Sequence, residues 1–264
     1  MLHFLGIGPT RCGTTWTNYM LRMHPQLWLP KVKELQFWWW LCRRNGGPDI
    51  SRHPDLFERM VNTYKEVFEG RGSHVCGEIS PNYCVLPPDI IEKIREINPG
   101  LKSFMIVRDP IDRSFSQMKL QLFYKEGIKP GEFKHLTADR FLEYLGQKEY
   151  YNDYEHHYDA WTSVFPPDQL LILDFEDISR RPANFLGKIA DHLGVDPFFW
   201  DDQLDKLIKI YNQIEAVEMP HEVRFILFNR YKRQAIKIAE RFNLNTDLWL
   251  SRHKDILALH KENQ

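Results

Sequence analysis

Four short apolar runs along the chain predict buried β-strands. Each run contains five or six residues and is bounded by polar or turn-forming residues. Continuous apolar runs of this length are typical of parallel strands that are covered on both faces. The predicted strands are Leu2–Ile7, Val75–Ile79, Lys102–Val107 and Leu170–Phe175.

Apolar positions at helical spacing lie between and after these runs. They recur at intervals of three and four residues, which predicts amphipathic helices at about residues 16–23, 110–122, 181–193 and 221–242. Asp109 followed by Pro110 marks the start of the second helix, since Asp caps helices and Pro fits their first turn. Gly194 marks the end of the third helix.

Strands that alternate with helices predict an α/β fold with a central parallel sheet flanked by helices. We expect one domain over residues 1–264. Two stretches without clean periodicity, at about 42–74 and 124–160, are expected to be lids or acceptor-binding inserts. Ligands of such sheets collect outside the carboxyl ends of the strands, so the residues that follow each strand are the first candidates for chemistry.

Composition narrows the class of protein. Hydrophobic residues make up 43% and aromatic residues 14%, as in a globular protein, and the net charge of −1 gives no reason to expect a nucleic acid partner. The four cysteines lack the spacing of a metal site or a disulfide framework, so we expect a cytoplasmic protein. We find neither a signal peptide nor an apolar stretch long enough for a membrane span.

The loop GPTRCGTT, residues 8–15, follows the first apolar run directly. A glycine turn between a strand and a helix presents backbone N–H groups and the positive end of a helix dipole, which bind phosphate-like anions. Thr14 and Thr15 add hydroxyl donors, and Arg11 adds a permanent positive charge. The alternative is an ordinary strand–helix turn, which the two threonines and the arginine disfavour.

An ATP-binding loop would carry a lysine after its second glycine, where this chain has Thr14. The run LLILD, which ends at Asp174, resembles a Walker B strand, but an aspartate at the end of a buried strand is common in α/β proteins. An ATP-dependent small-molecule kinase with a degenerate phosphate loop is therefore the alternative function, and a non-catalytic nucleotide-binding module is a third.

A second candidate anion site is RDPIDRSFS, residues 108–116. Arg108 ends a predicted strand, and Ser116 and Lys119 share one face of the helix that follows. An arginine and a hydroxyl in this arrangement can hold a second, separate phosphate. The alternative is an Arg108 ion-paired with a carboxylate and a solvated Ser116. Because this motif and the loop at 8–15 both follow strands, we expect them to face one crevice.

Together the two motifs resemble those of the sulfotransferases that use 3′-phosphoadenosine 5′-phosphosulfate (PAPS). The first motif of that family reads G-x-x-[KR]-x-G-T-[TS]-x-L and binds the 5′-phosphosulfate, and the second reads R-D-P-x-x-R-x-x-S and binds the 3′-phosphate. KELQFW (33–38) and GEISPNY (77–83) resemble segments of its carbohydrate and heparan-type branch. The two motifs occur here in order and about 100 residues apart, which makes the resemblance specific.

The resemblance implies a P-loop-NTPase-like sulfotransferase fold, PAPS as co-substrate and no metal. It implies in-line transfer of the sulfuryl group to an acceptor hydroxyl or amine, with Glu34 as base and Arg11 stabilising the leaving phosphate. The residues it assigns to the co-substrate are Arg11, Cys12, Gly13, Thr14, Thr15, Trp16, Arg108, Ser116 and Arg224.

The implied acceptor is a carbohydrate or another small metabolite, and Phe37, Trp38 and Glu78 are expected to contact it. The run FWWW can equally be part of the core, and Glu34 without the resemblance would be interpreted as a surface carboxylate beside Lys33. The chain departs from the family in four places. Arg11 and Ile79 stand where lysines are common, and Leu120 stands where some relatives carry a histidine. The late Lys-Gly-Arg loop has no clear counterpart, so Lys209, Asn212 and Arg224 are the candidates to complete the nucleotide pocket.

Overall fold

The computed structural model describes residues 2–42, 53–129, 131–203, 207 and 217–253 of the 264-residue chain. The chain folds into two compact units. Unit 1 consists of Met1–Val107 and Glu155–Tyr211, and unit 2 consists of Arg108–Tyr154 and Asn212–Gln264. The expectation of a single domain over the whole chain stays a prediction.

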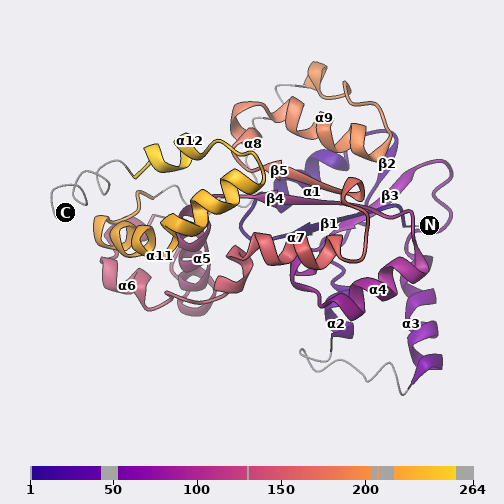
Figure 1. Ribbon diagram of the computed structural model, residues 1–264, viewed down its shortest axis with the longest axis horizontal. Helices are drawn as coiled ribbons and strands as arrows, with labels where there is room; N and C mark the ends of the chain where they lie inside the picture. Colours follow the sequence, from indigo (N-terminus) through magenta and orange to yellow (C-terminus); the bar gives the residue numbers. More distant parts are fainter. Residues whose placement is uncertain (1, 43–52, 130, 204–206, 208–216, 254–264) are drawn as a thin grey trace. The chain divides into compact units, whose positions relative to one another are not determined.

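A five-stranded parallel sheet forms the centre of unit 1 (Figure 1). It confirms the predicted α/β class and the four apolar runs, and it adds β2, which at two residues is too short to show a pattern in the sequence. The strands, in the spatial order β2-β3-β1-β4-β5, are β1 (Phe4–Gly8), β2 (Leu27–Trp28), β3 (Val75–Ile79), β4 (Lys102–Val107) and β5 (Leu170–Asp174).

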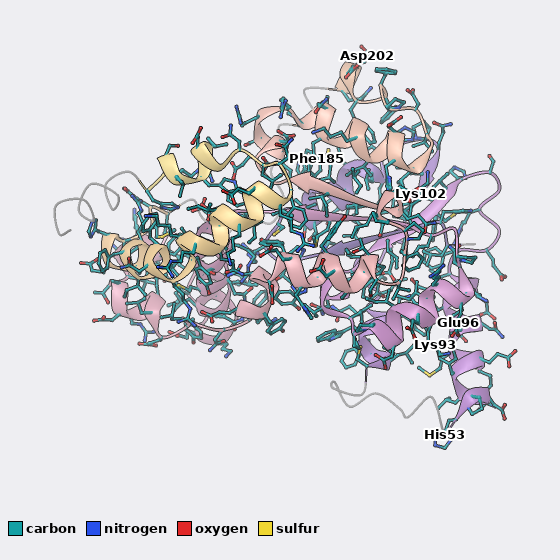
Figure 2. The ribbon with its side chains drawn as sticks, in the orientation of Figure 1. His53, Lys93, Glu96, Lys102, Phe185 and Asp202 are labelled. Carbon is teal, nitrogen blue, oxygen red and sulfur yellow. The ribbon has the colours of Figure 1, made fainter. Side chains whose placement is uncertain are left out.

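Helices flank this sheet as expected (Figure 1). On one side α1 (Thr14–Leu21) packs on α9 (Pro182–Leu193), where the rings of Trp16 and Phe185 meet edge to face with centroids 5.9 Å apart. Phe185 is labelled on α9 in Figure 2. On the other side lie α4 (Pro88–Ile97) and α7 (Tyr154–Thr162), and Trp161 donates to the backbone oxygen of Tyr83 at 3.0 Å. The remaining helices of unit 1 are α2 (Phe37–Leu41), α3 (Pro54–Glu66) and α8 (Asp177–Arg180).

Unit 2 is helical and has a hydrophobic core of its own. Its helices are α5 (Pro110–Glu126), α6 (Ala138–Leu142), α11 (His221–Arg241) and α12 (Thr246–Ser251). As predicted, Asp109 caps α5, with its carboxylate accepting from the backbone N–H of Ile111 at 2.9 Å. The core consists of Ile111, Phe115, Met118, Leu122, Phe133, Phe141, Met219, Val223, Leu227, Phe228 and Tyr231.

The two stretches expected to be inserts contain packed elements. Residues 43–52 lie outside the described part of the first stretch, and the rest of it forms α3, whose Val61 and Tyr64 are buried. The second stretch contains α6 and two 3-10 turns, which are anchored by the buried rings of Phe133, Phe141 and Tyr151. Their role as lids or acceptor-binding inserts stays a prediction. Among the described helices, none combines the length and apolar character needed to cross a bilayer.

The end of α9 provides a test of backbone conformation. Gly194 has a φ of 77° and lies in the left-handed region, and the N–H of Val195 closes the turn on the oxygen of Ala190 at 3.0 Å. We expect Gly194→Ala to lower the free energy of unfolding by about 1 kcal/mol, because a Cβ strains this conformation although the space around it is open. Urea unfolding measures the change.

Gly100→Ala is the matched control, since Gly100 is exposed and the nearest atom to an added Cβ is 3.9 Å away. It should change the stability by less than about 0.5 kcal/mol. Equal losses in the two variants would contradict the account.

Candidate active site

The loop between β1 and α1 adopts a backbone conformation that favours glycine at two of its positions. Gly8, Arg11 and Gly13 all have positive φ, at 107°, 67° and 75°. A Cβ on Gly8 would lie 2.2 Å from the backbone oxygen of Pro81, and one on Gly13 would lie 2.4 Å from the side chain of Ile178. Backbone packing therefore excludes a larger residue at Gly8, and the left-handed backbone disfavours one at Gly13, where the close atom is the end of a flexible side chain.

The helix that follows the loop offers its positive end. The first N–H groups of α1, at Thr14, Thr15 and Trp16, have no intrahelical acceptor. Within this described helix no side chain caps the start at Gly13, and no acidic residue lies in the first turn. Of the predicted loop residues, Cys12, Thr14 and Trp16 are buried, while Arg11 is half-buried. The local arrangement is that of an anion-binding turn.

Glu34 lies in an unusual backbone segment. Its φ is 61° and that of Gln36 is 53°, and each left-handed residue other than glycine costs about 1 kcal/mol. The Glu34 carboxylate forms an ion pair with Lys33, accepts from the Gln36 side-chain amide at 3.3 Å, and keeps 32% of its side chain exposed. Glu34 therefore presents a carboxylate at the surface from a constrained backbone.

Glu78 lies directly behind this segment and is buried, at 1% exposure. Its carboxylate accepts from the hydroxyls of Tyr64 (2.7 Å), Tyr83 (2.8 Å) and Ser80 (2.7 Å) and from the backbone N–H of Leu35 (3.1 Å). Burial raises the pKa of the Glu78 carboxyl, and the hydrogen bonds from its four donors oppose this in part.

The aromatic run divides between the core and the surface. Trp38 is 1% exposed, whereas Trp40 is 60% exposed. Phe37 is half-buried and stacks on Tyr64, with ring centroids 4.4 Å apart and an interplanar angle of 8°. The side chains of Trp38 and Glu78 are therefore packed in the interior, whereas the sequence analysis expected both to contact the acceptor. Their role in acceptor binding stays a prediction.

A groove of about 540 Å³ lies beside β2, and Leu35, the residue after Glu34, is one of the residues that line it. Its charged lining residues are all cationic, namely Arg22, Lys31 and Arg71. The Arg71 guanidinium lies over the Trp28 ring, 4.0 Å from its centroid. An aromatic ring with several cations and no carboxylate in the lining suits an anionic or polyhydroxylated ligand.

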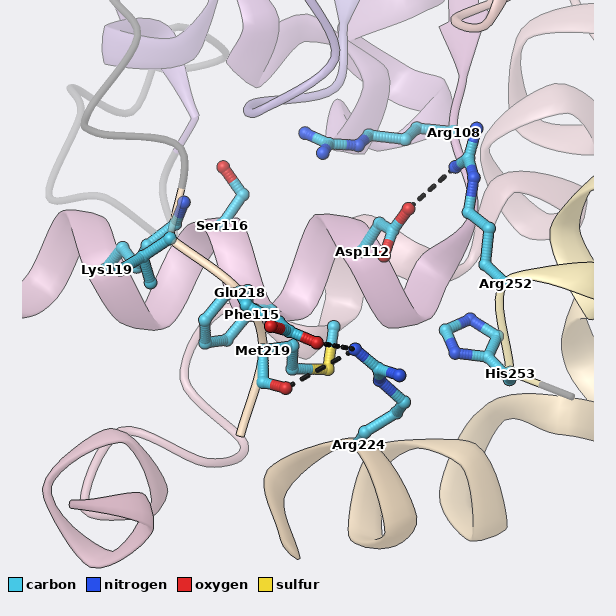
Figure 3. A pocket seen from close by; sticks show the side chains of 11 residues that line it. Arg108, Asp112, Phe115, Ser116, Lys119, Glu218, Met219, Arg224, Arg252 and His253 are labelled. Carbon is cyan, nitrogen blue, oxygen red and sulfur yellow. Dashed lines mark hydrogen bonds and ion pairs between the residues drawn. The ribbon is translucent and has the colours of Figure 1, made fainter. Parts of the chain in front are cut away.

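A pocket of about 340 Å³ in unit 2 is lined by Arg108, Ser116 and Arg224 (Figure 3). The sequence analysis assigned all three to the co-substrate, and that role stays a prediction. Lys119, one helical turn beyond Ser116, lines it too. Arg252 lines the pocket as well. The sequence analysis missed it, because it follows α12 and belongs to no recognisable motif. Lys209 and Asn212 lie outside the described residues.

The charges of this pocket are unbalanced in favour of cations. Arg108, Lys119, Arg224 and Arg252 supply four positive charges, against the two negative charges of Asp112 and Glu218. Arg252 donates to the Asp112 carboxylate at 2.7 Å, and Arg224 lies 3.8 Å from the Glu218 carboxylate (Figure 3). The pocket can therefore bind an anion of more than one charge.

One lining residue of the pocket, His253, belongs to a buried pair. His253 lies 3.2 Å from the Asp109 carboxylate, and both residues are almost fully buried. Burial raises the pKa of the Asp109 carboxyl, and its hydrogen bond with His253 opposes this in part. The Asp109 carboxylate thus contacts both the first turn of α5 and the His253 ring, and His253 is the sequence neighbour of Arg252.

Sulfotransferases are the known proteins that this chain resembles. The family model described as "Sulfotransferase family" matches residues 4–202, so the chain belongs to the sulfotransferase family. This confirms the resemblance that the two motifs indicated.

Two relatives are the bifunctional heparan sulfate N-deacetylase/N-sulfotransferase 3 of Mus musculus and the membrane-associated sulfotransferase kil1 of Dictyostelium discoideum. The first is 26% identical over 206 residues, which cover 74% of this chain and 22% of that protein. The second is 20% identical over 323 residues, which cover 91% of this chain and 65% of that protein. The chain thus spans about a fifth of the length of the heparan sulfate enzyme.

The fold is that of solved sulfotransferases. The crystal structure of a sulfotransferase from Alicyclobacillus acidocaldarius matches with a TM-score of 0.65 and 21% identity, over 94% of this chain and 98% of that one. At this identity the likeness shows the fold, and it confirms the predicted sulfotransferase architecture around the parallel sheet.

The raised pKa of Glu78 predicts a pH dependence. The folded state keeps a proton that the unfolded chain releases near the ordinary pKa of 4.5. The contribution of Glu78 to the free energy of unfolding is therefore largest below that pH and is lost as the pH rises through the folded pKa. Glu78→Gln has no proton to lose, so its stability should fall less over this window. Urea unfolding between about pH 4 and 8 tests this, and parallel curves for the two proteins would contradict it.

Proposed function

We propose that this protein transfers the sulfuryl group of PAPS to a hydroxyl or amine of a small-molecule or glycan acceptor. The observation that carries the proposal is the cation-rich pocket of unit 2, where Arg108 and Ser116 of the second motif meet Lys119, Arg224 and Arg252. A pocket with this excess of positive charge suits the 3′-phosphate, which distinguishes PAPS from ATP.

The loop at 8–15 holds the 5′-phosphosulfate in this proposal. Negative charge grows on the bridging oxygen as the sulfur–oxygen bond breaks. The N–H groups at the start of α1 and the Arg11 guanidinium stabilise that charge, and a donor placed in advance in this way contributes ~10²–10³ in rate. The leaving group is a phosphate monoester, which these donors accommodate without the lysine of an ATP-binding loop.

Glu34 takes the proton from the acceptor. Its exposed carboxylate and its constrained backbone support this role, which is worth ~10²–10⁴ in rate for a well-placed base. Lys33 and Gln36, which both contact this carboxylate, orient it.

The acceptor approaches along the groove beside β2, because Leu35, the neighbour of Glu34 in the sequence, lines that groove. Its three cations and the Trp28 ring favour an acidic or polyhydroxylated acceptor. The heparan sulfate and carbohydrate sulfotransferases among the relatives agree with a glycan of this kind.

Nucleotide binding separates this proposal from the kinase alternative. We expect 3′-phosphoadenosine 5′-phosphate to raise the melting temperature. A ligand present at 100 times its dissociation constant stabilises the folded protein by about 2.7 kcal/mol. Arg108→Ala should remove most of the shift because the 3′-phosphate loses its forked partner. Differential scanning fluorimetry measures both.

Arg233→Ala is the control, because Arg233 is an exposed arginine of α11 outside the pocket, and its shift should equal that of the wild type. Stabilisation by ATP–Mg²⁺ and none by the 3′-phosphorylated nucleotide would overturn the proposal in favour of a kinase.

Turnover tests the two catalytic assignments. We expect Glu34→Gln to lower kcat by about 10²-fold or more while nucleotide binding is kept, and Arg11→Ala to lower kcat by about 10²–10³-fold. Sulfuryl transfer from labelled PAPS across a panel of neutral and acidic oligosaccharides and small alcohols measures these effects.

Glu92→Gln, an exposed carboxylate of α4, serves as the control and should leave transfer unchanged. Near-full turnover in Glu34→Gln would contradict the role of the base, and a change of only a few-fold in Arg11→Ala would contradict that of the leaving-group cation.

A further inference from the structure

Three alternate residues, Glu78, Ser80 and Asn82, contact the segment that carries Glu34. Glu78 Oε2 accepts from the backbone N–H of Leu35 at 3.1 Å, and Ser80 Oγ accepts from that of Gln36 at 3.1 Å. Asn82, in the 3-10 turn η2 (Pro81–Val85), donates to the side-chain oxygen of Gln36 at 3.2 Å. The segment GEISPNY thus acts as a template for the segment KELQ.

The template is itself held rigidly. The Tyr64 and Tyr83 hydroxyls donate to Glu78 Oε1, at 2.7 and 2.8 Å, which leaves Oε2 directed at Leu35. Ser80 donates its hydroxyl proton to Glu78 Oε2 at 2.7 Å, so its oxygen lone pairs face the N–H of Gln36. Glu78, Ser80 and Tyr83 are at most 1% exposed, so water does not compete for these bonds.

The supported segment is one that does not hold its shape by itself. Glu34 and Gln36 are both left-handed, a conformation that such residues adopt only where their surroundings impose it. The backbone N–H groups of Leu35 and Gln36 donate to Glu78 and Ser80 of the template and so hold this part of the backbone in place.

We propose that Glu78, Ser80 and Asn82 are positioning residues that fix the carboxylate of Glu34, the first two through the backbone N–H groups of Leu35 and Gln36 and the third through the Gln36 side chain. This inference rests on the proposed role of Glu34 as base. The three residues touch neither acceptor nor co-substrate in this scheme, and their effect on the reaction passes through Glu34 alone.

The chemistry explains why such support matters. A base must meet the acceptor proton within hydrogen-bond reach, and a misplacement of ~1 Å costs about 10²-fold in rate. The Gln36 amide is the link, because it donates to Glu34 Oε2 at 3.3 Å while Asn82 holds its oxygen. Loss of the template should therefore lower kcat and leave the nucleotide site intact.

Ser80→Ala and Tyr64→Phe form a matched pair of variants. Each removes one hydroxyl that donates to the Glu78 carboxylate, but only Ser80 also contacts the Glu34 segment. We expect Ser80→Ala to lower kcat about 10-fold with an unchanged KM for PAPS. Tyr64→Phe keeps the ring that stacks on Phe37, and the Tyr83 hydroxyl still holds Glu78 Oε1 in this variant, so it should keep kcat within about twofold. Equal losses of kcat in the two variants would overturn the proposal.

A double-mutant cycle shows whether the effect passes through Glu34. In the Glu34→Gln background, Ser80→Ala should cause no further loss of kcat, because the base is already absent. A further loss of about 10-fold would mean that Ser80 acts by another route and would overturn the inference. Near-full turnover in Glu34→Gln alone would instead contradict the proposed base, so the two failures are distinguishable.

The melting-temperature shift with 3′-phosphoadenosine 5′-phosphate reports whether each variant is folded. If Ser80→Ala does not fold, Asn82→Ala carries the test, since Asn82 is half-buried and contacts Gln36 through its side chain alone in this template. It should lower kcat about threefold with an unchanged KM for PAPS, and lose this effect in the Glu34→Gln background. An unchanged kcat in a folded Asn82→Ala variant would contradict the part assigned to the Gln36 link.

Discussion

The parallel pairing of β1 with β3 is the constraint on which the candidate site of unit 1 depends. Phe4, Leu5 and Gly6 pair with Gly77, Glu78 and Ile79, and the N–H of Ser80 continues the ladder onto the oxygen of Gly6 at 3.0 Å. A slip of one residue would turn every side chain of β3 to the opposite face. The same pairing brings Pro81 against Gly8, so one strand pair sets both the start of the anion loop and the support of Glu34.

Most strands of this sheet could be predicted closely from the sequence, whereas some other elements could not. Val75–Ile79 and Lys102–Val107 match residue for residue, because buried parallel strands are nearly continuous apolar runs. β2 and α3 were missed, the first because it has two residues and the second because only Val61 and Tyr64 of its side chains are buried. The burial of Glu78 could not be predicted, since two of its partners, Leu35 and Tyr64, lie outside its own motif, 43 and 14 residues away in the sequence.

In the pocket of unit 2, too, residues close together in the sequence could be predicted and a residue from a distant part of the chain could not. The spacing of Arg108 and Ser116 is set by one strand end and two turns of one helix, and such local geometry can be inferred from a motif. Arg252 reaches Asp112 from 140 residues away, and nothing in its own neighbourhood of the sequence marks it. The position of Arg252 in this pocket follows from the packing of α11 on α5 and of α12 on α11, which periodicity alone does not specify.

The two anion sites of the proposal bind by different physical means. The loop at 8–15 relies on backbone N–H groups and a helix dipole, whose orientation is fixed by the chain and needs no counter-charge. The pocket relies on long cationic side chains, two of which lie beside carboxylates, Arg252 beside Asp112 and Arg224 beside Glu218. These carboxylates hold the cations in place before an anion arrives, at the cost of part of the attraction that the anion would receive. Rigid donors suit the group that reacts, where position governs the rate, and adjustable cations suit the phosphate that is only held.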